Sequence, residues 1–343
     1  MYVSVADQLP DVNPPAELDH VLERLREQHH TPGLALDRPP RRLSGGFWAE
    51  MWTLDLTPRA GSDLPPRVVL RVAPDTHLAA REIAVQAGVA AQGYPTPHIY
   101  ASDTTGRDGR AWSVMDFASG QPLLAGLNGL RAIATLPRLA AGLPDTIAHA
   151  AAALHQLDPA PIEAELDALS SNSAGVDRLL EHYLGHARAL ADEPLRRLVE
   201  RIATTKSDDQ PHVVCHGDLH PFNILTNGDQ HVVLDWTAAR IAHPAYDLAF
   251  TGLLLAHPPL NAPRPIQPIM NAAGRRIARR FMTTYQKLSP HPIDSDVLAW
   301  HRSLQACRIL LDLAGWRADG TTDGHAGHPW FAIEPAVRPL LSS

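Results

Sequence analysis

The sequence predicts an α+β fold in which a strand-rich first third precedes a mainly helical remainder. Up to residue 117, short apolar runs alternate with turn residues, a pattern typical of strands. From residue 121 onward, apolar residues recur at helical spacing over long segments. Two short apolar runs, at residues 213–215 and 232–234, each end at once in polar residues that a plain strand would not need. We therefore expect a polar site at the ends of these strands.

The composition limits the possible classes of protein. The chain has 343 residues, of which 45% are hydrophobic, enough for one large or two coupled domains. The formal net charge is −7 and no long basic run occurs, which disfavours nucleic-acid binding as the main function. Cys215 and Cys307 stand far apart and form neither a disulfide framework nor a zinc spacing, as is typical of the reducing cytoplasm. We expect a cytoplasmic protein with no membrane segment and no obligate protein partner.

The first third is predicted to form a sheet with two helices. The elements are a helix at 16–28, strands at 47–56 and 67–73, a helix at 77–92 and a strand at 111–117. The first helix has Leu18, Val21, Leu22 and Leu25 on one face, and we expect that face to pack on the sheet. The strand RVVLRVA carries Arg71 among apolar residues, and such a charge is costly unless it meets an anion.

The remainder is predicted to be mainly helical. Helices are expected at 143–157, in one or two pieces over 176–204, and at 248–255, 269–287 and 294–316. The Pro- and Ser-containing residues 158–175 are expected to form a surface excursion. We predict that Asp247 caps the N-terminus of the helix at 248–255, and that His155 is a packed structural histidine.

The stretch HVVCHGDLHPFNILTNGDQHVVLDW, residues 212–236, carries the candidate chemistry. Its first apolar run leads to Asp218 and its second to Asp235, with Asn223 and an Asn-Gly turn between the runs. The turn predicts a hairpin that brings these three side chains to one end. Two carboxylates and a carboxamide suit Mg²⁺, with one carboxylate left over to act as a base.

The run HGDLHPFN followed by LDW resembles the aminoglycoside phosphotransferase-like family of small-molecule kinases. These enzymes share the two-lobed protein-kinase fold, so the resemblance implies a small β-rich lobe at 1–117 and a larger, mainly α-helical lobe at 118–343. It implies that Asp218 accepts the proton of the substrate hydroxyl. It also implies that Asn223 and Asp235 are the Mg²⁺ ligands.

The resemblance also implies where ATP binds. The residues concerned are Ser44, Gly45, Gly46, Arg71, Glu82, Met115 and Phe117. The Ser-Gly-Gly segment would cover the phosphates, since glycine lets backbone N–H groups approach an anion. Arg71 stands where a protein kinase has lysine and would hold the phosphates, with Glu82 paired to it. The backbone that follows Met115 would form hydrogen bonds with the adenine ring.

The function that the resemblance implies is ATP- and Mg²⁺-dependent transfer of the γ-phosphoryl group to a hydroxyl of a small molecule. An aminoglycoside or related antibiotic, an amino sugar or an amino alcohol would be the acceptor. No A-P-E motif follows Asp235, and H-G-D replaces H-R-D, which favours a small-molecule kinase over a protein kinase. Two alternatives stay open. One is a nucleotide-binding pseudokinase without turnover, and the other a metallohydrolase that uses His216, Asp218 and His220.

Overall fold

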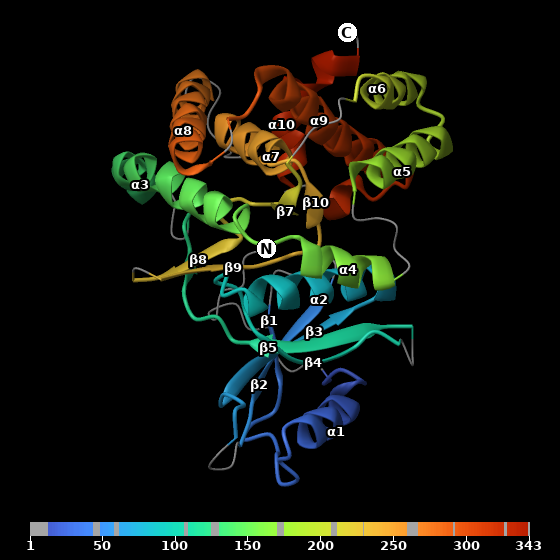
Figure 1. Cartoon of the computed structure of the whole chain (residues 1–343), viewed down its shortest axis with the longest axis vertical. Helices are drawn as coiled ribbons and strands as arrows, with labels where there is room; N and C mark the ends of the chain where they lie inside the picture. Colours follow the sequence, from blue (N-terminus) through green and yellow to red (C-terminus); the bar gives the residue numbers. More distant parts are fainter. Residues whose placement is uncertain are drawn as a thin grey trace. The chain divides into compact units, whose positions relative to one another are not determined.

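The computed structural model consists of two compact units that are described separately (Figure 1). The first comprises Met1–Asn128 and Pro221–Ala238, and the second comprises Gly129–His220 and Ala239–Ser343. The structure describes residues 13–43, 49–57, 62–105, 109–124, 130–169, 175–206, 211–228, 230–258, 267–290, 292–325 and 328–341, with only the backbone for 130–140 and 267. The predicted division into a nucleotide-binding lobe, 1–117, and a catalytic and substrate-binding lobe, 118–343, stays a prediction.

The first unit is organised on a five-stranded antiparallel sheet of strand order β1-β2-β3-β5-β4. The strands are β1 (Arg41–Leu43), β2 (Glu50–Asp55), β3 (Arg67–Ala73), β4 (Ile99–Asp103) and β5 (Ala111–Asp116). The predicted strand at 67–73 is confirmed with the same bounds and lies at the centre of the sheet. Its Val and Leu residues suit a pleated, two-sided environment, which explains why six of its seven residues are buried.

The two faces of β3 carry different residues because side chains alternate along a strand. Val68, Leu70 and Val72 belong to an apolar cluster that includes Val21 and Leu25 of α1 (Leu18–Gln28). The predicted packing of the first helix on the sheet is therefore confirmed (Figure 1).

The opposite face of β3 carries Arg71 and meets the helix α2 (Thr76–Ala91). Asp75 caps this helix, since its carboxylate accepts a hydrogen bond from the Leu78 N–H at 2.9 Å. Alanines on both elements, Ala73 and Ala79, pack together and let the helix approach the sheet closely.

A second, three-stranded sheet in the first unit corrects the predicted hairpin. Its order is β6-β8-β9, formed by β6 (Gln121–Pro122), β8 (Ile224–Asn227) and β9 (Gln230–Val233). The expected pairing of the runs at 213–215 and 232–234 is wrong. A two-residue loop pairs the residues directly beside it, so Asn227 faces Gln230 and the register runs back to Ile224. The run β7 (Val213–Cys215) instead pairs with β10 (Arg240–Ala242) in the second unit.

The second unit is mainly helical. Its helices are α3 (Leu130–Leu154), α4 (Ala160–Ala168), α5 (Val176–Ala189), α6 (Glu193–Thr204), α7 (Ala245–Ala256), α8 (Gln267–Leu288), α9 (Ser295–Ala318) and α10 (Pro329–Val337). Two 3₁₀ turns, Thr322–His325 and Arg338–Leu341, follow α9 and α10. In the described parts of the chain, no helix combines the length and apolarity that crossing a membrane requires.

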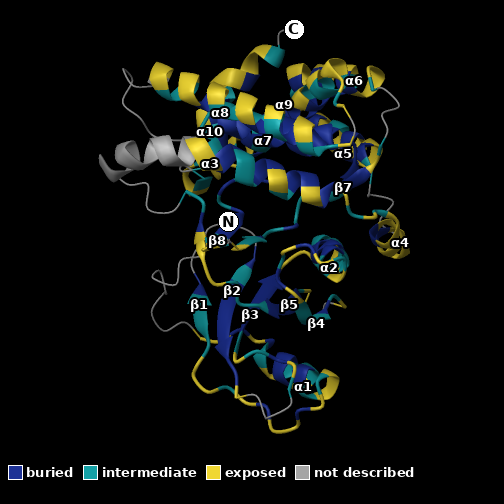
Figure 2. Ribbon diagram, turned by 60° about the vertical axis from the view of Figure 1, so that its left-hand side comes forward, coloured by how far each residue is buried: buried dark blue, intermediate teal, exposed yellow. Residues whose placement is uncertain are grey.

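The core of the second unit surrounds α7, which is buried over most of its circumference (Figure 2). A helix that is buried on nearly all sides belongs in a core, and α7 packs on both α8 and α9. Phe250 of α7 joins the main apolar cluster together with Leu310 of α9 and Trp330 of α10. This helix is therefore a fixed platform for the polar residues that it carries.

One prediction about the second unit is incomplete and another is wrong. Residues 158–175 include a helix that was not predicted, α4, in which Ile162 and Leu166, four residues apart, bury one helical face. Asp247 does not cap a helix beginning at 248. Helix α7 begins at Ala245 after Pro244, whose ring suits the start of a helix, so Asp247 lies in the first turn and is 1% exposed.

Candidate active site

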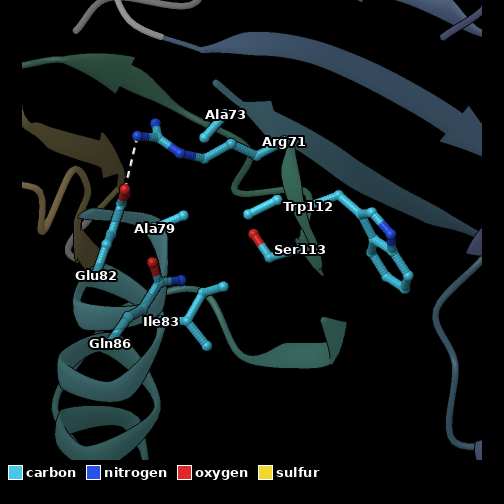
Figure 3. A pocket seen from close by; sticks show the side chains of 9 residues that line it. Arg71, Ala73, Ala79, Glu82, Ile83, Gln86, Trp112 and Ser113 are labelled. Carbon is cyan, nitrogen blue, oxygen red and sulfur yellow. Dashed lines mark hydrogen bonds and ion pairs between the residues drawn. The ribbon is translucent and has the colours of Figure 1, made fainter. Parts of the chain in front are cut away.

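Arg71 and Glu82 form a buried ion pair in the first unit. The Arg71 Nη2 atom lies 2.7 Å from the Glu82 Oε2 atom, and their side chains are only 9% and 6% exposed (Figure 3). The pair explains how the apolar strand β3 tolerates a charge. The predicted contact between these residues is present, and its role toward phosphates stays a prediction.

A chain of polar contacts connects this pair to Asp235. The Arg71 Nη2 atom donates to the Thr237 Oγ1 atom at 3.4 Å, and that hydroxyl donates to the Asp235 Oδ1 atom at 2.6 Å. Asp235 has φ 68°, a left-handed conformation that non-glycine residues adopt mainly where function or tertiary contacts require it. Sequence reasoning missed Thr237, although a hydroxyl two residues after an aspartate is a known local hydrogen-bond donor.

The charge of Glu82 is finely balanced. Burial raises the pKa of its carboxyl to about 7, against the opposing charge of Arg71 and with a further raising effect from Asp235. A small pocket beside the pair is lined by Gln86 of α2 and Ser113 of β5 (Figure 3). The charge of Glu82 is therefore coupled to both of its charged neighbours, Arg71 and Asp235.

An apolar patch shares the sheet face with Arg71. It consists of Leu43, Met51, Val69 and Met115, with Ile99 and Phe117 packed against it. Met115 and Phe117, two of the predicted ATP-site residues, thus lie together on this patch, and Gln86 donates from Nε2 to the Met115 sulfur at 3.7 Å. The predicted phosphate-covering residues Ser44, Gly45 and Gly46 lie outside the described residues.

Asn223 and Asp235 lie at the same end of the β8–β9 hairpin. The Leu234 N–H donates to the Asn223 carbonyl at 2.8 Å, which extends the ladder by one pair beyond Ile224 and Val233. The following Trp236 is anchored by a 2.8 Å hydrogen bond from its Nε1 to the Thr96 hydroxyl. A carboxylate and a carboxamide held together supply the hard oxygen ligands that Mg²⁺ prefers, so this donor set fits that ion.

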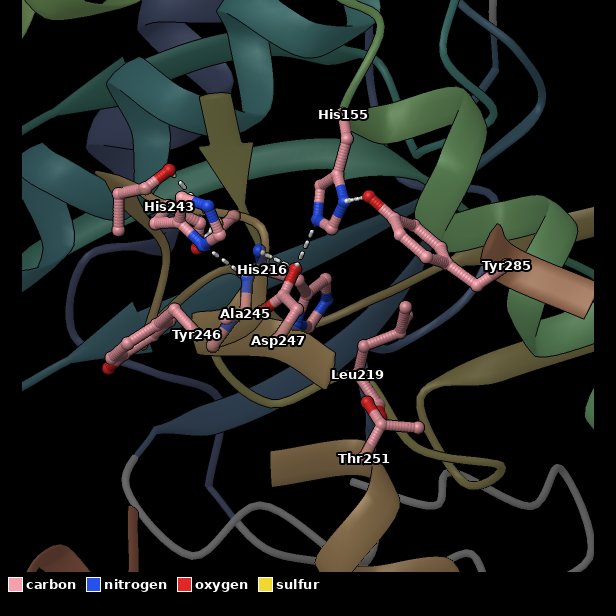
Figure 4. Close-up of polar contacts among 12 residues, drawn as sticks. His155, His216, Leu219, His243, Ala245, Tyr246, Asp247, Thr251 and Tyr285 are labelled. Atoms are coloured by element: carbon pink, nitrogen blue, oxygen red, sulfur yellow. Dashed lines mark hydrogen bonds and ion pairs between the residues drawn. The ribbon is translucent and has the colours of Figure 1, made fainter. Parts of the chain in front are cut away.

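The H-G-D segment is held by α7 within the second unit. The N–H groups of His216 and Gly217 donate to the two Asp247 carboxylate oxygens at 2.8 and 2.6 Å (Figure 4). The Thr251 hydroxyl donates to the Leu219 carbonyl at 2.7 Å. Gly217 has φ 75°, which explains why the motif has glycine there. These contacts fix the backbone on both sides of Asp218.

A buried network braces Asp247 in turn. The His155 Nε2 atom lies 3.1 Å from Asp247 Oδ2, and its Nδ1 atom lies 2.8 Å from the Tyr285 hydroxyl oxygen (Figure 4). His155 is thus a packed structural histidine, as predicted. Sequence reasoning missed Tyr285, which reaches the network from α8, 130 residues away along the chain.

One group of possible metal ligands occurs among the described residues, namely His155, Cys215 and Asp247, with ligand atoms within 4.8 Å of one another. The carboxylate already accepts hydrogen bonds from two backbone N–H groups. Burial and the charge of Asp247 raise the pKa of the Cys215 thiol, which therefore stays protonated. We read this group as part of the structural core.

Asp218 keeps the properties that a base requires. Its side chain is 24% exposed, and its Oδ2 atom lies 3.5 Å from the His220 Nε2 atom. Burial acts to raise the pKa of Asp218, but His220, Arg308 and His216 outweigh it and lower the pKa. The carboxylate is therefore ionised at neutral pH and can accept a proton.

The structure does not assemble the metal trio of the hydrolase alternative. His216, Asp218 and His220 form no such cluster within the described part of the chain. His216 is fully buried, and its Nδ1 atom accepts a hydrogen bond from the Asp218 N–H at 3.2 Å. The structure instead brings Arg71, Glu82 and Asp235 together in the first unit and holds Asp218 in the second.

Comparison with known proteins identifies the family. A family model described as the phosphotransferase enzyme family matches residues 39–291, which is most of the chain. No sequence among the curated proteins matches this one.

Three solved structures illustrate the fold. A candidate aminoglycoside phosphotransferase of Ralstonia eutropha is 20% identical, with TM-score 0.64 and coverage of 94% of this chain and 95% of that one. The macrolide 2′-phosphotransferase of Brachybacterium faecium is 17% identical, with TM-score 0.54 and coverages of 92% and 98%. A spectinomycin phosphotransferase bound to ADP and spectinomycin is 14% identical, with TM-score 0.54 and coverages of 95% and 97%.

These structural likenesses establish the fold, and the family match establishes the membership. The predicted protein-kinase-like α+β fold, with a small β-rich part and a larger helical part, is confirmed. The predicted phosphotransferase that uses an alcohol group as acceptor is confirmed as well. The chain belongs to the phosphotransferase enzyme family.

Proposed function

We propose that this phosphotransferase uses ATP and Mg²⁺ to phosphorylate a hydroxyl group of a small molecule. The observation that carries the proposal is the chain of contacts from Arg71 through Thr237 to Asp235, which begins on the sheet face that also bears the apolar patch. The cation suits the phosphates of a metal-bound nucleotide, the carboxylate suits its metal ion, and the apolar surface suits its base.

The first unit would bind the nucleotide. The patch around Val69 and Met115 suits the adenine ring, which is planar and apolar on its faces. Arg71, held in place by Glu82, would donate to phosphate oxygens, for which a guanidinium is well shaped. Asn223 and Asp235 would hold Mg²⁺, which when bound neutralises negative charge on the phosphates.

The second unit would supply the base. Asp218 would accept the proton of the acceptor hydroxyl as that oxygen bonds to the γ-phosphorus. The bond from the γ-phosphorus to the bridging oxygen breaks at the same time, and ADP leaves. Little covalent work falls to the protein in such transfers, so positioning dominates the catalysis. The bracing of the H-G-D backbone by Asp247 supplies that positioning.

The acceptor is proposed to be a hydroxylated antibiotic, an amino sugar or an amino alcohol. Structures with this fold include a ternary complex of an aminoglycoside phosphotransferase with AMP-PNP and hygromycin B, and the complex with ADP and spectinomycin. We propose a cytoplasmic enzyme that needs no protein partner or nucleic acid for this reaction.

The test is an ATP-consumption screen of the purified protein against a library of antibiotics and amino alcohols. Metal analysis and thermal shifts with MgATP accompany the screen. We expect stabilisation by MgATP and turnover with at least one acceptor. Stabilisation without turnover on any acceptor would indicate a pseudokinase. Tightly bound zinc with no response to ATP would refute the proposal in favour of a hydrolase.

A further inference from the structure

We propose that Arg308 of α9 is a positioning residue that holds the catalytic backbone through the carbonyl of Gly217. The proposal rests on the proposed function, because it concerns the loop that carries Asp218. The Arg308 Nη1 atom donates to the Gly217 carbonyl at 2.9 Å, across 91 residues of sequence. No motif in the sequence assigns this residue a role.

The two peptide groups of Gly217 form hydrogen bonds to side chains of two different helices. Asp247 of α7 accepts from the Gly217 N–H at 2.6 Å, and Arg308 of α9 donates to the carbonyl of the same residue. Glycine in the left-handed region is the most flexible kind of residue, so it gains most from external restraint. The carbonyl of Gly217 belongs to the peptide that leads into Asp218. The hydrogen bond from Arg308 thus restrains the backbone that carries Asp218.

Aromatic rings fix the position of the Arg308 guanidinium itself. Its central carbon lies 5.2 Å from the ring centre of Phe250 and 5.8 Å from that of Trp330. The Trp330 indole is held by a 3.1 Å hydrogen bond to Asp312. A planar cation packed against two rings loses little further freedom when it donates a hydrogen bond, which makes it a stiff support.

Arg308 also bears on the charge of Asp218. The titratable groups that act on Asp218 are His216 and His220 from its own segment, Arg308 from α9 and His328 from the start of α10. Burial, together with His325 and Arg308, lowers the pKa of His328 to about 4, so His328 is neutral at pH 7. Arg308 is permanently charged, and its removal should raise the pKa of Asp218.

The arginine near the catalytic aspartate comes from a different part of the chain than in the H-R-D motif of protein kinases. In that motif the arginine lies in the loop itself, whereas here glycine occupies that place and a helix far along the chain supplies the cation. The guanidinium is bonded to the loop carbonyl and packed on rings. It therefore acts as a constant brace for the loop.

The test compares Arg308→Met and Arg308→Lys with a matched control, Arg302→Met, an exposed arginine of the same helix. With the acceptor found in the screen, or water as the acceptor, we expect Arg308→Met to lower kcat between about tenfold and a hundredfold, because small misplacements cost that much. Its KM for MgATP should stay within about twofold.

The lysine variant separates charge from geometry. It keeps the cation, but kcat should recover only in part, because lysine lacks the planar stacked group. Hydrogen exchange supplies a readout that needs no turnover. The amides of residues 216 and 217 should exchange faster in Arg308→Met than in the wild type or in Arg302→Met.

The possible outcomes are distinct. A wild-type protein without phosphotransfer would refute the proposed function, and hydrogen exchange would then decide on Arg308 alone. Arg308→Met with normal kcat and unchanged exchange would overturn the inference. If the Met variant fails to fold, the Lys variant decides. Wild-type exchange and kcat in Arg308→Lys, or an equal loss of nucleotide binding and turnover, would reduce Arg308 to a core residue.

Discussion

Replacing Arg71 by Met should impair ATP binding far more than folding. The side chain loses its charge at nearly constant length, and it leaves Glu82 buried without its cation. Breaking a buried ion pair commonly costs about 3–5 kcal/mol, because one charge remains unpaired. The pKa of Glu82 shows why the cost here should be smaller.

The free energy follows from the protonation of Glu82. With a pKa of about 7 in the fold and 4.5 as its ordinary value, the buried carboxyl already costs the wild type roughly 3 kcal/mol at pH 7. Holding it fully protonated at pH 7 adds only a fraction of a kcal/mol to that cost. One lost hydrogen bond adds about 1 kcal/mol. We therefore expect a loss of about 1–2 kcal/mol, which lowers Tm by a few degrees.

The effect on the nucleotide should be larger and selective. A charge-assisted hydrogen bond to phosphate contributes about 1.5–3 kcal/mol, so ATP affinity should fall roughly 10- to 100-fold while adenosine affinity changes little. Arg71→Lys should be partly active. The assay combines titrations of ATP and adenosine with melting curves. Arg81→Met, next to Glu82 in sequence, is the matched control and should bind ATP like the wild type.

The sign of the pH dependence gives a second check. Glu82 has a raised pKa in the fold, so the folded state holds more protons than the unfolded state between pH 4.5 and about 7. Its contribution therefore makes the protein less stable as pH rises through that window. In Arg71→Met the pKa of Glu82 rises further, and the added instability should grow above pH 7. A loss near 5 kcal/mol at pH 7, with ATP and adenosine weakened equally, would refute the reasoning.

Three further substitutions test the other groups. Asp218→Asn should abolish transfer yet bind MgATP, as measured by coupled assay and calorimetry; near-normal turnover would remove Asp218 from the role of base. Asp235→Ala should weaken the Mg²⁺ dependence of nucleotide binding, and equal affinities at every Mg²⁺ concentration would contradict the metal assignment. Asp247→Ala leaves two buried N–H groups unpaired and should cost about 2–5 kcal/mol in urea unfolding, with a loss below 1 kcal/mol arguing against the brace.

Much of the first unit could be predicted because its signals are local. The alternation in RVVLRVA places Arg71 and Val69 on one face of β3 whatever the rest of the chain does. The turn at Asn227-Gly228 was also predicted correctly, but the strand that precedes it in the hairpin, β8, was not. Turn chemistry specifies where the chain reverses, while the register between strands depends on the residues immediately beside the loop.

By itself, the sequence determined the spacing of the H-G-D, Asn and Asp residues and the buried charge that demands a partner. These features act over a few residues, where backbone conformation and side-chain periodicity decide the outcome. Only the tertiary structure decided that Asp247 accepts two loop N–H groups, that Tyr285 reaches His155 and that Arg308 holds Gly217. Such contacts join segments up to 130 residues apart. Their partners depend on how helices pack around α7, and no local pattern records that packing.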